Sequence, residues 1–294
     1  MLSTILPQLH SGRSRGVRSL PFRPGRAASR LKFDTVCFEY FVPVGEQGAS
    51  LRALKVVTAA AILAVALTPA AASAASGATW CLEVIAPYAS TLTSATCGHG
   101  FVQVDVPDGG TQVVTVTNSR QASTYAVFNG FYFTGVTWHH QWGPWTARIG
   151  YNGFASPGQK TEGDGRTPQG TYGFQFMFGV NPNPAVHFSW RHAYTYDYWD
   201  DDPASPRYNL WTDIRTQNAG AHPEPMHQVP VYNYAAVIGY NIARTPGAGS
   251  AIFLHVGNGG DTAGCVSLPQ TRLLEVLRWL KPTAHPVITM RVIS

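Results

Sequence analysis

Two residues in the C-terminal third of the chain could form a nucleophile and its base. His255 lies near the end of the β-type run 251–256, and Cys265 follows it ten positions later. A cysteine that performs acyl transfer needs a base within hydrogen-bond reach of its sulfur. The segment between the two residues is rich in glycine, so it can fold back and bring them together. The spacing therefore predicts a cysteine acyl-transfer site, with Cys265 as the nucleophile and His255 as the base.

Acyl transfer also needs donors that face the oxyanion formed in the transition state. Gly264 directly precedes the nucleophile, and without a side chain its backbone can approach a substrate closely. We therefore expect the backbone amides of Gly264 and Cys265 to be oxyanion donors.

The four cysteines divide into a pair, an N-terminal residue and one odd thiol. Cys81 and Cys97 lie 16 positions apart, and Cys37 lies upstream of an apolar segment. In an exported protein we expect a Cys81–Cys97 disulfide, which would stabilise the fold by roughly 3 kcal/mol. Cys265 is then unpaired, which makes it a candidate nucleophile. The alternative is a buried, inert thiol.

The segment 51–74 has the pattern of a secretory signal peptide. Arg52 and Lys55 precede the apolar run Val56–Leu67, and Ala72-Ser73-Ala74 provides small residues for cleavage. The run is shorter than the about 20 residues that cross a membrane, so we expect no retained membrane span. The Arg-rich residues 1–50 are either an atypical leader or the result of a start codon assigned too far upstream. We expect the mature protein to be secreted to the cell wall.

The basic charge of the chain belongs to this leader. The whole chain has 21 Lys and Arg against 16 Asp and Glu, but residues 75–294 have 12 against 13. The mature part is therefore close to neutral, and its charge does not indicate a nucleic-acid partner.

Short β-type runs dominate the mature part. They cover 112–117, 123–128, 130–137, 171–178, 235–240 and 251–256, and Gly, Pro, Asn and Asp separate them. One amphipathic helix is predicted over 270–281, between Pro269 and Pro282. The pattern predicts a mostly β fold, an antiparallel sandwich or barrel-like sheet with a short helix after Cys265. We expect residues 75–110 to form an N-terminal segment and residues 111–294 the catalytic domain. The amides before that helix should favour a thiolate on Cys265.

Residues 195–232 show little regular pattern. Long irregular stretches in compact domains are often functional loops, so we expect this one to lie over the cleft between Cys265 and His255 as a lid. A packing loop is the alternative.

The segment around the two candidate catalytic residues resembles the signature of the L,D-transpeptidase (YkuD-like) catalytic domain family. The family pattern is His-x-Gly, a spacer, then Ser/Thr-His-Gly-Cys-Val/Ile-Arg/Asn. Its matches here are His255, Gly257, Thr262, Gly264, Cys265 and Val266. A second element, Gly163–Tyr172 with Thr167-Pro168-Gln169-Gly170, resembles the family's Thr-Pro-x-Gly-x-Phe/Tyr turn. Together the resemblance covers roughly residues 111–292.

The resemblance implies a YkuD-type domain that forms a thioester between Cys265 and a peptidoglycan stem peptide. An amine of a second stem would then resolve the thioester and form a cross-link, without a metal or organic cofactor. It also implies that Thr262, Gly257 and Gly264 shape the substrate site. Ala263 and Ser267 depart from the pattern. Ser267 can still donate one hydrogen bond to the substrate, but it cannot bind a carboxylate through two bonds as Arg does. We expect a monomer whose partners are stem peptides.

Other functions remain open at this stage. Water as the acceptor would give an L,D-carboxypeptidase, and loss of activity would leave a silent wall-binding protein. Retention of both His255 and Cys265 favours the enzyme, because a silent protein needs neither.

Further side chains could bind ligands but have structural alternatives. The pairs His187/His192 and His222/His227 lack the spacing of a zinc hydrolase, and His139-His140 are adjacent on a predicted strand. The tryptophans 138, 142 and 145 could stack on sugars or fill the core. The aspartates 197, 200, 201 and 202 could bind an amine or face solvent, and Arg148 and Arg166 could hold a carboxylate or a turn.

Overall fold

The computed structural model describes residues 77–84 and 97–293. The predicted leader 1–50, the predicted signal peptide 51–74 and Cys37 lie outside the described residues. Within the described ranges, none of the helices has the length and apolar character needed to cross a bilayer.

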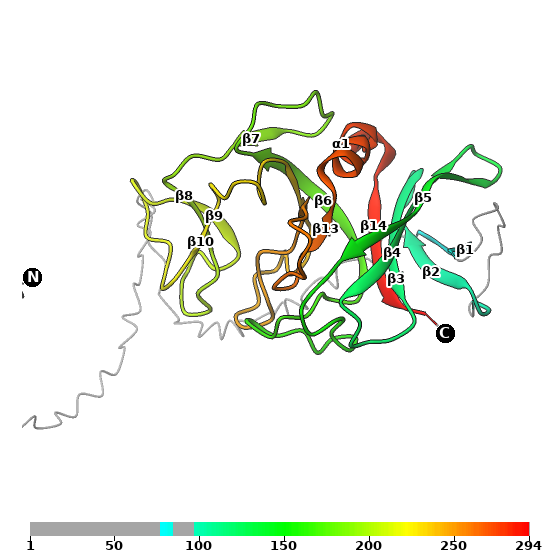
Figure 1. Cartoon of the computed structure of the whole chain (residues 1–294), viewed down its shortest axis with the longest axis horizontal. Coiled ribbons are helices and arrows are strands. Elements are labelled where there is room, and N and C mark those ends of the chain that lie inside the picture. Colours follow the sequence, from blue (N-terminus) through cyan, green and yellow to red (C-terminus); the bar gives the residue numbers. More distant parts are fainter. Residues whose placement is uncertain (1–76, 85–96, 294) are drawn as a thin grey trace, which may run out of the picture. The chain divides into compact units, whose positions relative to one another are not determined.

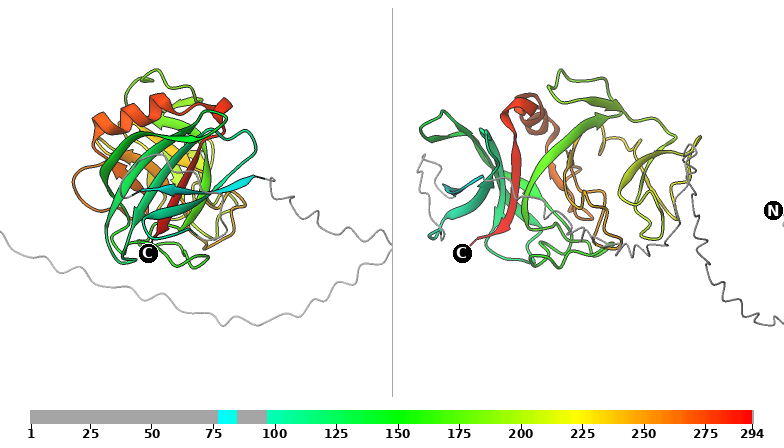
Figure 2. Two further views of the ribbon diagram at one scale, coloured as in Figure 1. Left: turned by 90° about the vertical axis from the view of Figure 1, so that its right-hand side faces the viewer. Right: turned by 180° about the vertical axis from the view of Figure 1, so that it is seen from behind.

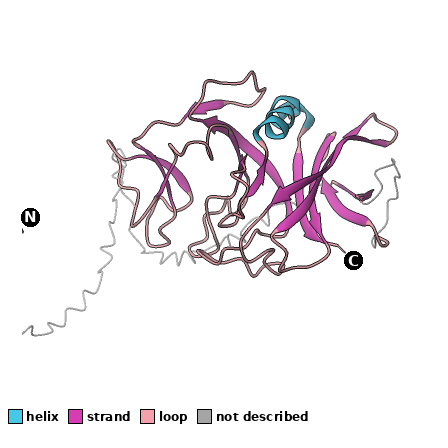
Figure 3. Cartoon of the chain, in the orientation of Figure 1, coloured by secondary structure: helices cyan, strands magenta, loops and turns pink. Residues whose placement is uncertain are grey.

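The described residues form a mostly β structure with a single α-helix (Figure 3), which confirms the predicted fold class. The strands are β1 (Ala78–Glu83), β2 (Phe101–Val106), β3 (Gln112–Asn118), β4 (Tyr125–Phe133), β5 (Trp138–Arg148), β6 (Gly170–Gly179), β7 (Trp190–His192), β8 (Asp197–Asp200), β9 (Leu210–Asp213), β10 (Glu224–Pro225), β11 (Ala235–Ile238), β12 (Phe253–Val256), β13 (Val266–Leu268) and β14 (Val287–Val292). The helix α1 (Gln270–Trp279) follows β13, and the 3-10 helix η1 (Pro282–Ala284) follows α1.

The largest sheet closes on itself as a barrel (Figures 1 and 2). Its strand order is β11-β12-β13-β5-β4-β3-β14-β6-β7, and a further pairing of β11 with β6 joins the two sides. Most pairs are antiparallel, but β12–β13, β14–β3 and β6–β7 are parallel. The closure removes free edges from the strands that carry the site and fixes their register.

Helix α1 packs against the strands that carry the candidate catalytic residues. Leu273, Val276 and Leu277 are buried in the main core together with residues of β12 and β13. Their i, i+3, i+4 spacing produces this apolar face. The helix ends at Trp279, two residues earlier than expected. The backbone amide of Leu280 still donates to the carbonyl of Val276, but Leu280 itself is extended.

The N-terminal hairpin β1–β2 is closed by a disulfide within its own segment and packs on the barrel through apolar side chains. Cys81 and Cys97 form the predicted disulfide, with their Cα atoms 5.5 Å apart. Leu82, Val102 and Val104 share a core cluster with residues of β3, β4, β5 and β14. The hairpin therefore extends the core of the barrel.

The two runs predicted at 123–128 and 130–137 are one strand, β4. The break was predicted at Asn129, but Asn129 pairs with Thr115 of β3, and the next residue, Gly130, lies opposite Trp142 of β5. A Cβ atom at Gly130 would lie 2.3 Å from the Trp142 ring. The glycine therefore makes room for a cross-strand indole and does not mark a turn.

The segment 195–232 is more ordered than its sequence indicates. The strands β8, β9 and β10 form a three-stranded antiparallel sheet of their own. Trp199 and Met226 from this segment are buried in a cluster that also contains Phe253 and Cys265. Trp199 lies in the part 197–206 of this segment, so shortening the segment there would remove a buried side chain from this cluster.

Candidate active site

The alternation of side chains along β12 and β13 places the two candidate catalytic residues on one face of the barrel wall. Leu254 and Val266 are register partners in this parallel pair, and both face the main core beneath α1. The intervening side chains point the other way, because successive residues of a strand face opposite sides. His255 is therefore on the same face as its register partner Ser267. Cys265 lies two residues before Ser267 and reaches the same face, where it packs with Phe253.

His255 is held in one tautomer by the backbone. Its Nδ1 atom lies 2.9 Å from the carbonyl oxygen of Val256. A carbonyl can only accept, so Nδ1 carries the hydrogen and Nε2 of the neutral ring keeps its lone pair. The ring of Tyr232 meets the imidazole edge-on, at 5.5 Å between centroids and 90° between planes. These contacts fix the orientation of the imidazole and leave Nε2 as the nitrogen that could accept a proton.

The thiol of Cys265 is buried, with 7% of the residue exposed. Its Sγ atom donates to the carbonyl of Ala251 at 3.2 Å and accepts from the backbone amide of Phe253 at 3.3 Å. Among the described residues, no hydrogen bond joins Sγ directly to the imidazole of His255. In this resting arrangement the thiol hydrogen is therefore held by a backbone carbonyl.

Both groups are neutral at rest. Burial, followed by the charge of Glu224, raises the pKa of the Cys265 thiol well above its usual range. Burial also lowers the pKa of His255 to about 4, against a smaller opposing effect of its bond to Val256. The sequence led us to expect a thiolate stabilised by the amides before α1. The structure differs because β13 separates Cys265 from the helix and the sulfur lies in a buried setting.

A neutral thiol predicts a characteristic alkylation profile. The rate of reaction of Cys265 with iodoacetamide should rise about tenfold per pH unit from pH 6 to pH 9, because the thiolate fraction rises in that proportion below the pKa. Peptide mapping by mass spectrometry would measure the rate at Cys265. A plateau below pH 8 would instead show a preformed thiolate and imidazolium pair.

Thr262 and Gly264 shape the turn before the nucleophile. The Thr262 hydroxyl donates to the carbonyl of Cys265 at 2.7 Å and accepts from the amide of Gly264 at 3.1 Å. The Gly264 amide is therefore occupied, which corrects the expectation that it is a free oxyanion donor. The sequence could not show this bond, because it depends on how the turn closes. Of the two amides we expected, that of Cys265 remains the candidate.

The two family-like sequence elements meet at Gly264. The hydroxyl of Thr167 donates to the Gly264 carbonyl at 2.8 Å. Gly264 has a φ of +149°, and a Cβ atom there would lie 2.9 Å from the carbonyl oxygen of Arg166. Both the backbone conformation and the close approach require glycine at this position.

Gly257 and Ser267 lie beside His255 on the ladder. The Gly257 amide donates to the carbonyl of Leu268 at 2.7 Å, and a Cβ atom at Gly257 would meet the Ser267 hydroxyl at 3.2 Å. Ser267 is buried and pairs with Arg148 of β5. Arg148 contacts Asp261 at 3.6 Å and lies over the Tyr125 ring. Arg148 therefore has structural partners.

Cys265 and His255 line the same cavity, of about 300 Å³. The segment 195–232 forms one wall of it, as expected for a segment over the cleft. This wall comprises Asp201, Glu224, Gln228, Val231 and Tyr232. Lys160 and Glu162 line it from the segment before Thr167. The sequence did not single out Lys160, Glu162, Glu224 or Tyr232, since no local spacing shows that they approach Cys265.

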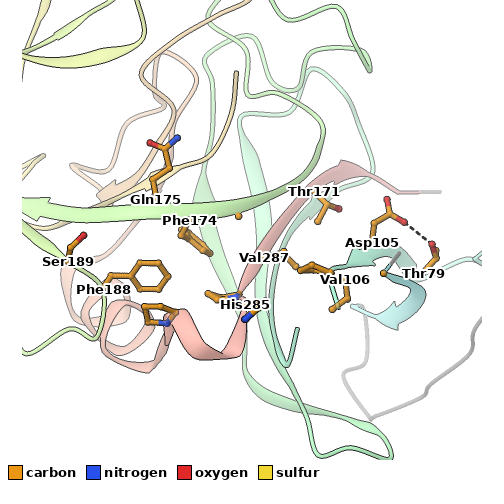
Figure 4. A pocket seen from close by; sticks show the side chains of 15 residues that line it. Thr79, Asp105, Val106, Thr171, Phe174, Gln175, Phe188, Ser189, His285 and Val287 are labelled. Atoms are coloured by element: carbon orange, nitrogen blue, oxygen red, sulfur yellow. Dashed lines mark hydrogen bonds between the residues drawn. The ribbon is translucent and has the colours of Figure 1, made fainter. Parts of the chain in front are cut away.

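A larger cavity, of about 1000 Å³, lies between the β1–β2 hairpin, β6 and β14 (Figure 4). Phe174 and Phe188 line it together with His285, and Asp105 at its rim accepts from the Thr79 hydroxyl at 2.9 Å. It contains neither Cys265 nor His255, so its size does not make it the reaction site.

The other residues considered from sequence have mainly structural roles. Trp138 is buried in the core, whereas Trp142 and Trp145 are partly buried and stack on each other and on Phe128 at the edge of the main core. Asp197 and Asp200 are buried and accept local hydrogen bonds, whereas Asp201 lines the cavity. Within the described ranges, no group of three His, Cys, Asp or Glu residues is arranged to hold a metal ion.

The residues that form this site, Cys265, His255 and Gly264, lie within the part of the chain that matches a known protein family. The model of the L,D-transpeptidase catalytic domain, YkuD, matches residues 100–289. The chain belongs to this family. No curated protein and no solved structure matches the chain. The L,D-transpeptidase match runs from β2 into β14, so it contains the barrel except for the last residues of β14, and it includes both elements that meet at Gly264.

Proposed function

We propose that the protein is a secreted L,D-transpeptidase that acylates Cys265 with a peptidoglycan stem peptide and passes the acyl group to an amine. The observation that carries this proposal is the shared cavity, into which Cys265 and His255 project from one face of β12 and β13. The Cys81–Cys97 disulfide supports secretion, because disulfides persist in oxidising compartments.

The reaction begins from the neutral pair. The Cys265 proton moves to Nε2 of His255 as the sulfur attacks the carbonyl that joins an L-centre to D-alanine. The carbon–sulfur bond forms, and the proton on Nε2 passes to the nitrogen of D-alanine as the peptide bond breaks. An acceptor amine then attacks the thioester, loses a proton to His255 and releases the sulfur, which recovers its proton from the imidazolium. The hydrogen bond from Nδ1 to the Val256 carbonyl keeps Nε2 available to accept and return these protons.

The burial that keeps the thiol neutral also favours aminolysis. A thioester in a cavity of about 300 Å³ is shielded from bulk water, so an acceptor that binds there competes well with hydrolysis. The segment 195–232 supplies this shielding, as a fixed wall or as a lid.

Incubation of the purified protein with tetrapeptide muropeptides tests this function. We expect release of D-alanine and formation of cross-linked dimers, both measured by chromatography and mass spectrometry. Tripeptides without dimers would identify an L,D-carboxypeptidase. Unchanged muropeptides would contradict the enzymatic proposal and favour a silent wall-binding protein.

A further inference from the structure

Four carboxylates line the cavity of Cys265; Asp261 pairs with Arg148, whereas Glu162, Asp201 and Glu224 have no ion pair among the described residues. Asp201 and Glu224 come from the segment 195–232, and Glu162 comes from the segment before Thr167. Glu162 accepts from the hydroxyls of Tyr208 and Ser250, and Glu224 accepts from the hydroxyl of Tyr232. These donors are neutral, so they orient the carboxylates without cancelling their charge.

The basic groups near the cavity are already paired. Lys160 donates to the Asp164 carboxylate and to the carbonyl of Thr161, each at 2.7 Å. Burial, followed by the charge of Glu162, raises the pKa of Asp201 to about 6. Burial, opposed by the Tyr232 bond and reinforced by Asp201 and Glu162, raises the pKa of Glu224 to about 7. The carboxylates therefore repel one another, and a cation that enters the cavity relieves this repulsion.

A second feature of the cavity, independent of the carboxylates, is the acceptor nitrogen Nε2 of His255. The imidazole of His255 is 7% exposed, and its bond to Val256 uses only Nδ1. Within the described part of the chain, Nε2 has no hydrogen-bond partner, although His255 lines the cavity. Because His255 lines the cavity, a bound molecule can donate a hydrogen bond to Nε2. A primary amine supplies N–H donors to both the carboxylates and Nε2.

We infer that Glu162, Asp201 and Glu224 form a subsite for the acceptor's primary ammonium group, next to the thioester on Cys265. This inference rests on the proposed function and specifies its second substrate. The subsite prefers an amine without a carboxylate on the same carbon, because the carboxylates of the subsite, which are all ionised above about pH 7, would repel that carboxylate. Ser267, with no positive charge, offers no compensation at the family's usual Arg or Asn position.

The subsite also prepares the amine for attack. The bound ammonium gives one proton to a carboxylate of the subsite and becomes a neutral amine. Its nitrogen attacks the thioester carbon, the carbon–sulfur bond breaks, and His255 receives the second proton and returns it to the sulfur. The protonated carboxyl group then loses its proton to solvent.

Two acceptors that differ in the group next to the amine test the subsite. Because a neutral amide lowers the pKa of the amine beside it, each aminolysis rate is expressed per concentration of free amine. D-norleucine carries a carboxylate on the amine-bearing carbon, and D-norleucinamide carries a neutral amide there. For each, the ratio of aminolysis to hydrolysis of the acyl-enzyme is measured in the wild type, Glu224→Gln and Asp201→Asn. Asp213→Asn is the matched control, since Asp213 lies in the same segment and pairs with Arg215 outside the cavity.

We expect the wild type to favour D-norleucinamide by about tenfold or more, since like charges repel strongly in a shielded cavity. Each cavity variant should reduce this preference several-fold, and Asp213→Asn should keep it. An equal preference in the wild type, or an unchanged preference in both folded cavity variants, would overturn the inference. The mass of the acyl-enzyme is measured first. Failure to form the acyl-enzyme would contradict the proposed function. Normal acylation without the preference for D-norleucinamide would contradict the subsite alone.

Discussion

Replacing His255 with alanine should lower the rate of Cys265 acylation by about a thousandfold. The thiol is neutral because burial raises its pKa, so its proton must be taken during the attack. Nε2 of His255 is the acceptor that the structure orients, through the Nδ1 bond to Val256. The variant should remain folded, because the lost ring borders an existing cavity.

The rate of thioester formation with a tetrapeptide donor, followed by intact-protein mass spectrometry, measures this effect. His187→Ala is the matched control, since His187 is exposed and does not line the cavity. Circular dichroism would establish that both variants are folded. Acylation of His255→Ala at near the wild-type rate would exclude His255 as the base.

Replacing Gly264 with alanine should lower the acylation rate by about a hundredfold. The residue has a φ of +149°, where side chains are strained, and the new Cβ atom would lie 2.9 Å from the Arg166 carbonyl oxygen. Relief of this contact would shift the turn and weaken the Thr167–Gly264 bond, which displaces the neighbouring Cys265. A displacement of about 1 Å in a reacting group is sufficient for such a loss.

Gly260→Ala is the matched control for this variant. Gly260 lies in the same loop, its φ is not positive, and a Cβ atom there would meet only the Asn258 side chain at 3.4 Å. We expect Gly260→Ala to acylate at close to the wild-type rate. Equal rates for the two alanine variants would show that the turn at Gly264 tolerates a side chain and does not position the nucleophile.

The sequence was sufficient to predict the pair and the strand beside it because those features are local. The β-type run that contains His255 and the odd thiol at Cys265 are visible in the residue order, and the apolar spacing of α1 is equally local. The Cys81–Cys97 disulfide followed from cysteine number and compartment. The family resemblance added the turn around Thr167.

The remaining features depend on long-range contacts that residue order does not show. Glu224 approaches Cys265 only because β10 pairs with β8 and the segment 195–232 folds over β12. The neutral state of the thiol follows from burial that arises in the same packing. The break was predicted at Asn129 because the indole of Trp142, which occupies the space beside Gly130, lies on the next strand.

The most direct test of the account is to locate the acyl group. The purified protein is incubated with a tetrapeptide donor, quenched at low pH and digested, and the modified peptide is sequenced by mass spectrometry. The account predicts a thioester-linked tripeptide on Cys265, with loss of D-alanine, and no adduct in Cys265→Ala. An acyl group on another residue would contradict the account. So would turnover that leaves no adduct on the wild type and continues in Cys265→Ala.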